Sequence, residues 1–410
     1  MTKLTSYPKE KINILLLENI SENAVLQFNN AGYKNVKRIK GALSESELIK
    51  EIKNVHLLGI RSKTLLTENI LRSGKKLLAA GCYCIGTNQV NLQSATEKGI
   101  ALFNAPYSNT RSVAELVIGS AIMLLRRIPE KNTAAHSGIW LKDASGSFEL
   151  RGKKLGIIGY GNIGLQVSVL AEALGMEVLY YDAEPKLPIG NAKPVRTLME
   201  LLQQTNIVSL HIPETASTKD LIGKNEIACM QKGSILINYA RGNVLDLPAL
   251  AEAIKSGQIG GAAIDVFPDE PEKTGSTFSS VLQNIPNVML TPHIGGSTEE
   301  AQINISEDVS FKLLNFLEKG ITTGSLSVPA LNLPTTPNTH RILHIHKNIP
   351  GVLSSITLKL SSHNINIIGQ YLKTNDQIGY VVLDVDKNMS KEAFSLLKDV
   401  KGTIKSRMLW

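Results

Sequence analysis

The sequence has 410 residues, of which 43% are hydrophobic and 20% charged, with a formal net charge of +8. This length predicts two or three domains, and the composition is ordinary for a globular enzyme. No apolar run approaches the roughly 20 residues that cross a bilayer, and residues 1–10 lack the apolar core of a secretory signal, so we expect a cytoplasmic protein without a membrane partner. The basic residues are scattered and form no stripe, which argues against nucleic-acid binding. Cys82, Cys84 and Cys229 form no Cys-x-x-Cys pair, so we expect reduced thiols and no metal site.

Short apolar runs alternate with helical patterns over the first hundred residues. The predicted strands are residues 12–17, 55–60, 77–80 and 101–103, and residues 21–31 are a predicted helix. This alternation indicates a doubly wound parallel sheet. Residues 112–127 are apolar on almost every side, which predicts a buried helix at a domain or subunit interface.

A glycine motif opens the second group of strands. Residues 155–164 form an apolar run that leads into Gly159-Tyr-Gly161-Asn-Ile-Gly164. In the strand–turn–helix setting of a dinucleotide site, Gly159 permits the tight turn and Gly161 lets a pyrophosphate approach the backbone. Gly164 lets the helix pack close to the sheet.

The residues around this motif complete the pattern of a dinucleotide site. The amides of Asn162 and Ile163 would lie at a helix N-terminus, where partial positive charge attracts phosphate. The next predicted strand, residues 177–181, ends at Asp182, which stands where a carboxylate accepts the ribose hydroxyls. That carboxylate would repel a 2′-phosphate, so the predicted cofactor is NAD. A glycine-rich turn that binds nothing would leave Asp182 unexplained.

Three ionisable residues follow successive predicted strands, which are residues 234–238, 262–266 and 288–290. They are Arg241, Glu270 and His293. Because the carboxyl ends of parallel strands surround the ligand crevice, all three can point toward a bound nicotinamide. Taken singly, Arg241 is typical of a solvated charge after a strand, Glu270 of a turn, and His293 of the residues that precede a helix. Their joint occurrence after a dinucleotide motif favours a catalytic role.

Each of the three has a role in oxidising a 2-hydroxy acid. Arg241 can bind a carboxylate with its planar fork and polarise the neighbouring carbonyl. His293 can take the hydroxyl proton, because imidazole titrates near neutral pH. Glu270 can orient the imidazole and stabilise the imidazolium. The hydride acceptor is the cofactor itself.

The C-terminal part has a different pattern. A helix is predicted over residues 298–319, and the proline-punctuated residues 328–339 are predicted to be a linker. The tail then follows the order strand, helix, strand, strand, helix, strand, which is a ferredoxin-like unit. The corresponding ranges are 341–347, 350–362, 365–372, 379–385, 392–398 and 403–409.

These motifs together resemble the D-2-hydroxyacid dehydrogenase family over essentially the whole length, and in particular its phosphoglycerate-oxidising members. Beside the glycine motif, the resemblance depends on Asn238-Tyr-Ala-Arg-Gly242, Gly261-Ala-Ala-Ile-Asp-Val-Phe-Pro268 with Glu270-Pro271, Thr291-Pro-His-Ile-Gly-Gly-Ser297, and two earlier segments, residues 81–88 and 104–118. It implies that Arg241, Glu270 and His293 are catalytic. The implied cofactor contacts are Asn162, Ile163, Asp182, Tyr239, Ala240, Arg241, Asp265, His293, Ile294, Gly295 and Gly296.

The resemblance also implies a division into domains. A flavodoxin-like substrate-binding domain would comprise residues 1–108 and 301–333, and a Rossmann-type NAD-binding domain residues 109–300. Residues 339–410 resemble an ACT domain, a module that senses amino acids. In family members inhibited by serine, positions matching His346, Asn348 and Asn366 bind that effector.

The implied reaction is the oxidation of 3-phospho-D-glycerate to 3-phosphohydroxypyruvate, the first step of L-serine biosynthesis. The substrate phosphate needs cations beyond the three catalytic groups. Arg61 is the best candidate, its alternative being a surface charge at a strand end, and Lys142 is a weaker one; Arg241 would bind the carboxylate. Other D-2-hydroxyacid dehydrogenases, with a side activity on 2-oxoglutarate, and an NAD-sensing binding protein are the rival hypotheses.

Regulation and assembly are further expectations. Pro337-Asn338-Thr339 stands where serine-regulated relatives have a Gly-Gly hinge, and a stiffer linker would weaken transmission of the effector signal. A dimerising tail without an effector is the alternative to regulation by serine. A metal site at His344-x-His346 lacks a third ligand.

The helix at 112–127 and the edge of the tail suggest self-association, for which we expect a tetramer.

Overall fold

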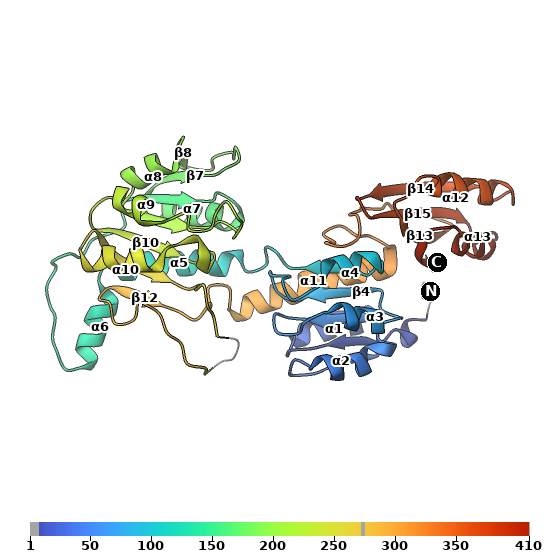
Figure 1. Ribbon diagram of the computed structural model, residues 1–410, viewed down its shortest axis with the longest axis horizontal. Helices are drawn as coiled ribbons and strands as arrows, with labels where there is room; N and C mark the ends of the chain where they lie inside the picture. The colour runs from blue at the N-terminus through green and yellow to red at the C-terminus, as the bar shows by residue number, and fades with distance from the viewer. Residues whose placement is uncertain (1–7, 272–274, 410) are drawn as a thin grey trace. The chain divides into compact units, whose positions relative to one another are not determined.

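The computed structural model describes residues 8–271 and 275–409. The chain divides into two compact units. The outer unit comprises the residues up to Ser108 and those from Gln302 onward, and the middle unit comprises Asn109–Ala301. No helix among the described residues is long and apolar enough to cross a membrane. Figure 1 shows the elements of each unit.

The N-terminal part of the outer unit is a five-stranded parallel sheet in the order β2-β1-β3-β4-β5, as predicted for a flavodoxin-like domain. Its strands are β1 (Ile14–Leu16), β2 (Val36–Arg38), β3 (Leu57–Ile60), β4 (Ala79–Cys82) and β5 (Ala101–Asn104). The helices are α1 (Glu22–Asn30), α2 (Glu45–Glu51), α3 (Glu68–Ser73) and α4 (Leu92–Glu97), with 3-10 turns at Lys9–Lys11 and Ile52–Asn54. Helix α11 (Glu299–Lys319) belongs to the outer unit from Gln302 onward. Strand order reverses between β1 and β3, so the ligand crevice of such a sheet lies at their carboxyl ends.

The middle unit is built on a seven-stranded parallel sheet in the order β12-β11-β10-β9-β6-β7-β8, which confirms the predicted Rossmann-type fold. Its strands are β6 (Lys154–Ile158), β7 (Glu177–Tyr181), β8 (Lys193–Pro194), β9 (Ile207–Leu210), β10 (Ser234–Asn238), β11 (Ile259–Ile264) and β12 (Val288–Leu290). The helices are α5 (Thr110–Leu125), α6 (Ile128–His136), α7 (Asn162–Ala173), α8 (Leu198–Gln204), α9 (Lys224–Cys229) and α10 (Leu247–Lys255), with a 3-10 turn at Gly242–Val244.

Helix α5 corresponds to the predicted helix at 112–127. One face, including Val113, Val117 and Leu124, is buried in the core of the middle unit. Glu115 and Ile122 are exposed, so the helix is buried on one side and not on all sides.

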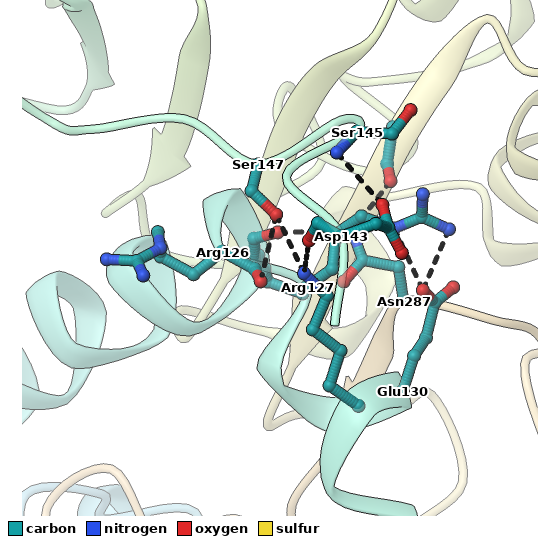
Figure 2. A network of polar contacts seen from close by, with 10 residues as sticks. Arg126, Arg127, Glu130, Asp143, Ser145, Ser147 and Asn287 are labelled. Carbon is teal, nitrogen blue, oxygen red and sulfur yellow. Dashed lines mark hydrogen bonds and ion pairs between the residues drawn. The ribbon is translucent and has the colours of Figure 1, made fainter. Parts of the chain in front are cut away.

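A polar network fixes the chain after α5 (Figure 2). Arg127 binds Glu130 at the start of α6, at 2.8 Å. Lys131 donates to the carbonyl of Asp143 at 2.7 Å and to the hydroxyl of Ser147 at 3.1 Å, which closes the loop that follows α6. That loop carries the exposed apolar side chains Ile139, Trp140 and Leu141, and Trp140 is 83% exposed.

The C-terminal part of the outer unit confirms the predicted ferredoxin-like unit. Its antiparallel sheet has the order β14-β15-β13-β16, from β13 (Thr339–Lys347), β14 (Ile367–Thr374), β15 (Ile378–Asp386) and β16 (Thr403–Leu409). Helices α12 (Val352–Ser361) and α13 (Ser390–Lys398) contribute Ile356 and Leu397 to one core of this sheet. Leu343 and Ile345 of β13 belong to a different hydrophobic core, which includes Phe316 of α11.

The segment predicted to be a linker is shorter in the structure. Val328 and Leu333 are buried in the core of the outer unit, and the hydroxyl of Thr322 accepts from the amide of Leu331. Farther on, Thr336 donates to Asp384 of β15 at 2.7 Å, and Thr339 already belongs to β13. The prolines therefore punctuate a packed segment, and the prediction of a free linker over 328–339 is wrong in its first half.

Candidate active site

The glycine motif forms the turn between β6 and α7. Gly159 has a φ of +93°, and a Cβ there would lie 2.5 Å from the carbonyl oxygen of His211. A Cβ on Gly164 would lie 2.2 Å from the carbonyl oxygen of Gly159, so the helix and the turn are too close for any side chain there. Gly161 differs, because its backbone is extended and a Cβ would meet nothing within 4 Å. The protein does not itself require glycine at 161, and the open space before α7 fits a phosphate group.

Asp182 lies at the end of β7, beside this turn. Its carboxylate accepts from the amide of Tyr160 at 2.8 Å and from the amide of Glu184 at 3.0 Å. The side chain is half-buried, so its position is fixed while it stays accessible. A fixed carboxylate at this strand end fits a ribose diol.

The three predicted catalytic residues follow neighbouring strands of the sheet. Arg241 follows β10, Glu270 follows β11 and His293 follows β12. His293 Nδ1 lies 2.7 Å from Glu270 Oε2, and Glu270 Oε1 accepts from the amide of Phe267 at 3.0 Å. The bond at Nδ1 leaves Nε2 as the nitrogen that can take a substrate proton.

The pair shifts the pKa values of both partners. The hydrogen bond to Glu270 is the largest influence on His293 and raises its pKa, against the lowering effect of burial. Burial alone would raise the pKa of Glu270, but the hydrogen bonds from His293 and Phe267 outweigh it, so this pKa is lower than usual. The positive charge of Arg241 lowers the pKa of Glu270 further and partly offsets the rise in the pKa of His293. Because the three residues follow neighbouring parallel strands, they lie at one edge of the sheet.

Arg241 lies on a turn that Asn238 organises. The buried Asn238 side chain donates to the carbonyl of Arg241 at 2.9 Å and accepts from the amide of Ala240 at 3.1 Å. One guanidinium nitrogen donates to the carbonyl of Ala240 at 2.6 Å. Arg241 is exposed, and its other donors are available to a carboxylate.

Asp265 anchors the loop that carries His293. Its carboxylate is 2% exposed and accepts from the amides of Ile294 and Gly295, both at 2.8 Å, and from the hydroxyl of Thr291 at 2.5 Å. His293 has a φ of +54°, an unusual conformation for a residue with a Cβ, and its amide donates to the carbonyl of Asp265 at 2.8 Å. Both carboxylate oxygens of Asp265 are engaged by the loop, which gives this residue a positioning role beside the predicted cofactor contact.

Two buried residues near this loop refine the predictions. The hydroxyl of Tyr239 lies 2.7 Å from that of Ser120 on α5, so the ring is buried in the core and a cofactor contact would have to come from its backbone. Asn109 was not predicted. A Cβ on Gly296 would lie less than 2 Å from its amide nitrogen, and its Oδ1 is buried without a partner among the described residues. Asparagine is a common N-cap residue just before a helix, so the sequence around Asn109 did not indicate a functional role.

The two cationic residues predicted to bind the substrate phosphate lie far apart in the sequence. Arg61 directly follows β3 in the outer unit, and its guanidinium has no hydrogen bond or ion pair among the described residues. Its amide donates to the carboxylate of Glu18 at 3.0 Å, and its carbonyl accepts from Gln89 at 2.7 Å. Lys142 is exposed in the loop after α6 of the middle unit. Neither Glu18 nor Gln89 was predicted.

Of the predicted effector residues, His346 lies on β13, Asn348 directly follows this strand and Asn366 directly precedes β14. His346 is buried at the end of β13; its Nδ1 lies 2.8 Å from the carbonyl of Lys347, and its Nε2 has no partner among the described residues. Asn348 donates to the carbonyl of Asn375 at 2.8 Å, and Asn366 is exposed. His344 is a core histidine that contacts Thr403 at 2.9 Å, and burial lowers its pKa to about 4. The described residues contain no cluster of three side chains that could hold a metal ion.

Comparisons with known proteins show which family the chain is similar to. Residues 118–295 match the family described as D-isomer specific 2-hydroxyacid dehydrogenase, NAD binding domain, and residues 342–405 match the AHAS small subunit-like ACT domain. D-3-phosphoglycerate dehydrogenase of Haemophilus influenzae is 50% identical over 410 residues, 100% of both chains. The enzyme of the same name from Escherichia coli K12 is 49% identical over 407 residues, 99% of both chains. The crystal structure of D-lactate dehydrogenase from Aquifex aeolicus complexed with NAD and lactic acid is similar with a TM-score of 0.65 and 27% identity, covering 78% of this chain and 100% of that one.

Proposed function

Since this chain belongs to the D-3-phosphoglycerate dehydrogenase family, we propose that it oxidises 3-phospho-D-glycerate to 3-phosphohydroxypyruvate with NAD, the first step of L-serine biosynthesis. The chain has the NAD-binding domain of the D-isomer specific 2-hydroxyacid dehydrogenases. The observation that carries the proposal is the Glu270–His293 pair at 2.7 Å beside Arg241, in a chain 50% identical to such an enzyme over its full length.

The middle unit supplies the groups for the proton transfer. His293 Nε2 takes the proton of the substrate C2 hydroxyl, while Glu270 holds the ring through Nδ1 and stabilises the imidazolium that results. Arg241 binds the substrate carboxylate through its free donors and polarises the C2 oxygen. Bound NAD supplies the acceptor for the hydride from C2.

We assign the cofactor contacts to this chain's residues as follows. The amides of Asn162 and Ile163, at the N-terminus of α7, would bind the pyrophosphate in the space left open by Gly161. Asp182 would accept the ribose hydroxyls. The nicotinamide end would contact two loops, residues 239–241 and 293–296, the second held by Asp265.

The rival within enzymes is a dehydrogenase for an unphosphorylated 2-hydroxy acid, because Arg241, Glu270 and His293 recognise only the carboxylate and the hydroxyl. Arg61 favours the phosphorylated substrate, since its guanidinium is a second cation without a partner among the described residues. We also propose reduction of 2-oxoglutarate as a side activity, because this acid has the same 2-oxocarboxylate group.

A panel of substrates tests the proposal. NADH formation is followed with 3-phosphoglycerate, D-glycerate, D-lactate and 2-hydroxyglutarate, and NADH consumption with 2-oxoglutarate. We expect the highest kcat/KM for 3-phosphoglycerate, and NAD to be preferred to NADP because Asp182 repels a 2′-phosphate. A higher kcat/KM for an unphosphorylated acid would replace the proposed substrate, and no turnover with any of them would favour an NAD-sensing binding protein.

The C-terminal sheet, the regulatory part of the proposal, would bind serine at His346, Asn348 and Asn366. An imidazole and two amides suit an amino acid with a hydroxyl, and the unpartnered Nε2 of His346 can accept one hydrogen bond. Titration calorimetry with serine on the wild type and on Asn366→Ala tests this assignment. Loss of binding in the variant supports it, and equal binding contradicts it. Binding without inhibition would show that the segment before β13 transmits the signal poorly.

Assembly, location and domain division complete the proposal. We propose a tetramer, since apolar side chains such as Trp140 and Ile122 are exposed in the middle unit and edge strand β14 exposes Ile368 and Leu372. Light scattering after size-exclusion chromatography tests the subunit number.

The three free cysteines suit a reducing compartment, and we propose the cytoplasm. We keep the three-domain division of 1–108 with 301–333, 109–300 and 339–410 as a functional proposal.

A further inference from the structure

A buried carboxylate at the end of β1 is used in an unusual way. Glu18 is 8% exposed and makes no salt bridge among the described residues. Its carboxylate instead accepts three backbone amides from the segment after β3: Arg61 at 3.0 Å, Lys63 at 2.9 Å and Thr64 at 2.9 Å. Glu18 also has a φ of +57°, a strained conformation for a residue with a Cβ. The surrounding structure keeps this carboxylate in place at a conformational cost.

Gln89 holds the same segment from the other side. Its amide nitrogen, on a side chain 9% exposed, donates to the carbonyl of Arg61 at 2.7 Å. The same nitrogen lies 3.3 Å from the carbonyl of Gly86 and 3.3 Å from the sulfur of Cys84, in the turn after β4. The N–H and the C=O of Arg61 are therefore both held, and its side chain is the free part.

The position of this arrangement in the sheet points to a ligand. Glu18 follows β1 and Arg61 follows β3, and the strand order reverses between these two strands. In open α/β sheets, ligands bind at the carboxyl ends of the strands at such a reversal. The positive charge of Arg61 reaches the turn after β4, where it acts to lower the pKa of Cys84 against the larger, raising effect of burial.

We propose that Glu18 and Gln89 are positioning residues, which fix the backbone of Arg61 so that its guanidinium binds the phosphate of the substrate. This inference rests on the proposed function, because it takes 3-phosphoglycerate as the substrate. A carboxylate that accepts three amides holds them more firmly than a neutral acceptor, since hydrogen bonds to a charged group are stronger. Replacing one oxygen by an amide nitrogen brings a donor against donors, so Glu18→Gln loosens the segment without changing its size.

The experiment compares Glu18→Gln, Gln89→Met, Arg61→Ala and the double variant Glu18→Gln/Arg61→Ala in the full-length enzyme. Glu22→Gln is the matched control, because Glu22 is an exposed glutamate of the same unit, 81% exposed, that pairs with Arg38. KM and kcat are measured for 3-phosphoglycerate and for D-glycerate, and amide hydrogen exchange is measured by mass spectrometry on peptides covering residues 58–66.

For Glu18→Gln and Gln89→Met we expect faster exchange of this segment and a KM for 3-phosphoglycerate about tenfold higher, with kcat and the KM for D-glycerate within about twofold. Arg61→Ala should show the same selective rise, and the double variant should be no worse than Arg61→Ala alone, because both changes remove one interaction. The control should match the wild type.

Two results would overturn the inference. One is unchanged exchange in Glu18→Gln; the other is faster exchange with equal KM effects on both substrates, which a merely structural role would give. A wild-type enzyme that does not oxidise 3-phosphoglycerate rejects the proposed function instead. The positioning of Arg61 is then decided by the exchange rates, which do not depend on any substrate.

Discussion

The Glu270–His293 pair links catalysis to pH through its charges. Because the hydrogen bond to Glu270 raises the pKa of His293, the imidazole is protonated over a wider pH range than an isolated histidine. Oxidation of a hydroxyl needs the neutral ring, whereas reduction of the ketone needs the protonated ring. The oxidation rate should therefore rise as pH increases through the raised pKa, and the reduction rate should fall over the same range.

Replacing Glu270 tests this coupling. In Glu270→Gln the pKa of His293 loses its main raising influence, so the acid limb of kcat/KM for oxidation should move to lower pH. The plateau value of kcat should fall by on the order of a hundredfold or more, because the imidazolium loses its stabilising charge. The measurement is a pH–rate profile with saturating NAD. Asp269→Asn, an exposed neighbouring carboxylate, is the control and should keep the wild-type profile. An acid limb that stays in place would disprove the assigned role of Glu270.

The turn between β6 and α7 shows how an element combines folding with binding. Gly159 and Gly164 are required by contacts within the protein, since a Cβ at either position would meet backbone atoms at 2.5 Å or less. Gly161 has no such contact, so the fold does not require a glycine there, and we propose that the bound cofactor does. On this proposal, substitutions within these six residues can separate folding from cofactor binding.

The two classes of glycine predict opposite outcomes. Gly161→Ala should keep the melting temperature of the wild type and raise the Kd for NAD by at least about tenfold, since the methyl group occupies the space of the pyrophosphate. Gly164→Ala should lower the free energy of unfolding by about 1–3 kcal/mol, the usual cost of overpacking. Calorimetry measures both quantities. Tight NAD binding by Gly161→Ala would show that the cofactor does not approach this turn.

The sequence predicted long apolar elements better than short polar ones. Every strand of the C-terminal sheet was predicted; β15 is buried on both faces and has a mostly apolar run, and β13 alternates apolar residues with buried histidines. Strands β2 (Val36–Arg38) and β8 (Lys193–Pro194) were missed, because they are short, polar edge strands with no hydrophobic pattern. The carboxylates of Glu18 and Asp265 bind backbone amides of distant segments, and no local pattern specifies such long-range contacts.

At the scale of the whole chain, the C-terminal sheet belongs to the same compact unit as the segment that precedes it and contacts that segment. The hydroxyl of Tyr380 donates to the carbonyl of Gly320 at 2.6 Å, and Arg407 donates to the carbonyl of Phe316 at 2.6 Å. These carbonyls belong to the last turn of α11 and to the residue after it, and that of Phe316 also accepts from the amide of Gly320 at 3.1 Å. A tail predicted as a separate domain therefore supplies donors to the segment that precedes it, and its stability is joined to that of the outer unit.

Lys405 on β16 makes the stability of the outer unit dependent on pH. Its ammonium donates to the carbonyl of Leu77 at 2.7 Å, and burial, with the charge of Arg407, lowers its pKa from 10.5 to about 8. Between these two values the unfolded chain binds more protons at this position than the folded chain, so this group makes stability rise with pH.

The difference in unfolding free energy between the wild type and Lys405→Met should therefore change with pH. Below about pH 8 the wild type bears the cost of a buried ammonium, and the variant should be at least as stable. Above that value the wild type gains stability relative to the variant. Urea unfolding at pH 7, 8, 9 and 10 measures this difference. Lys401→Met, an exposed lysine before the same strand, is the control and should show no such trend. A difference in unfolding free energy that stays constant with pH for Lys405→Met would mean that this lysine remains protonated and hydrated in the folded protein.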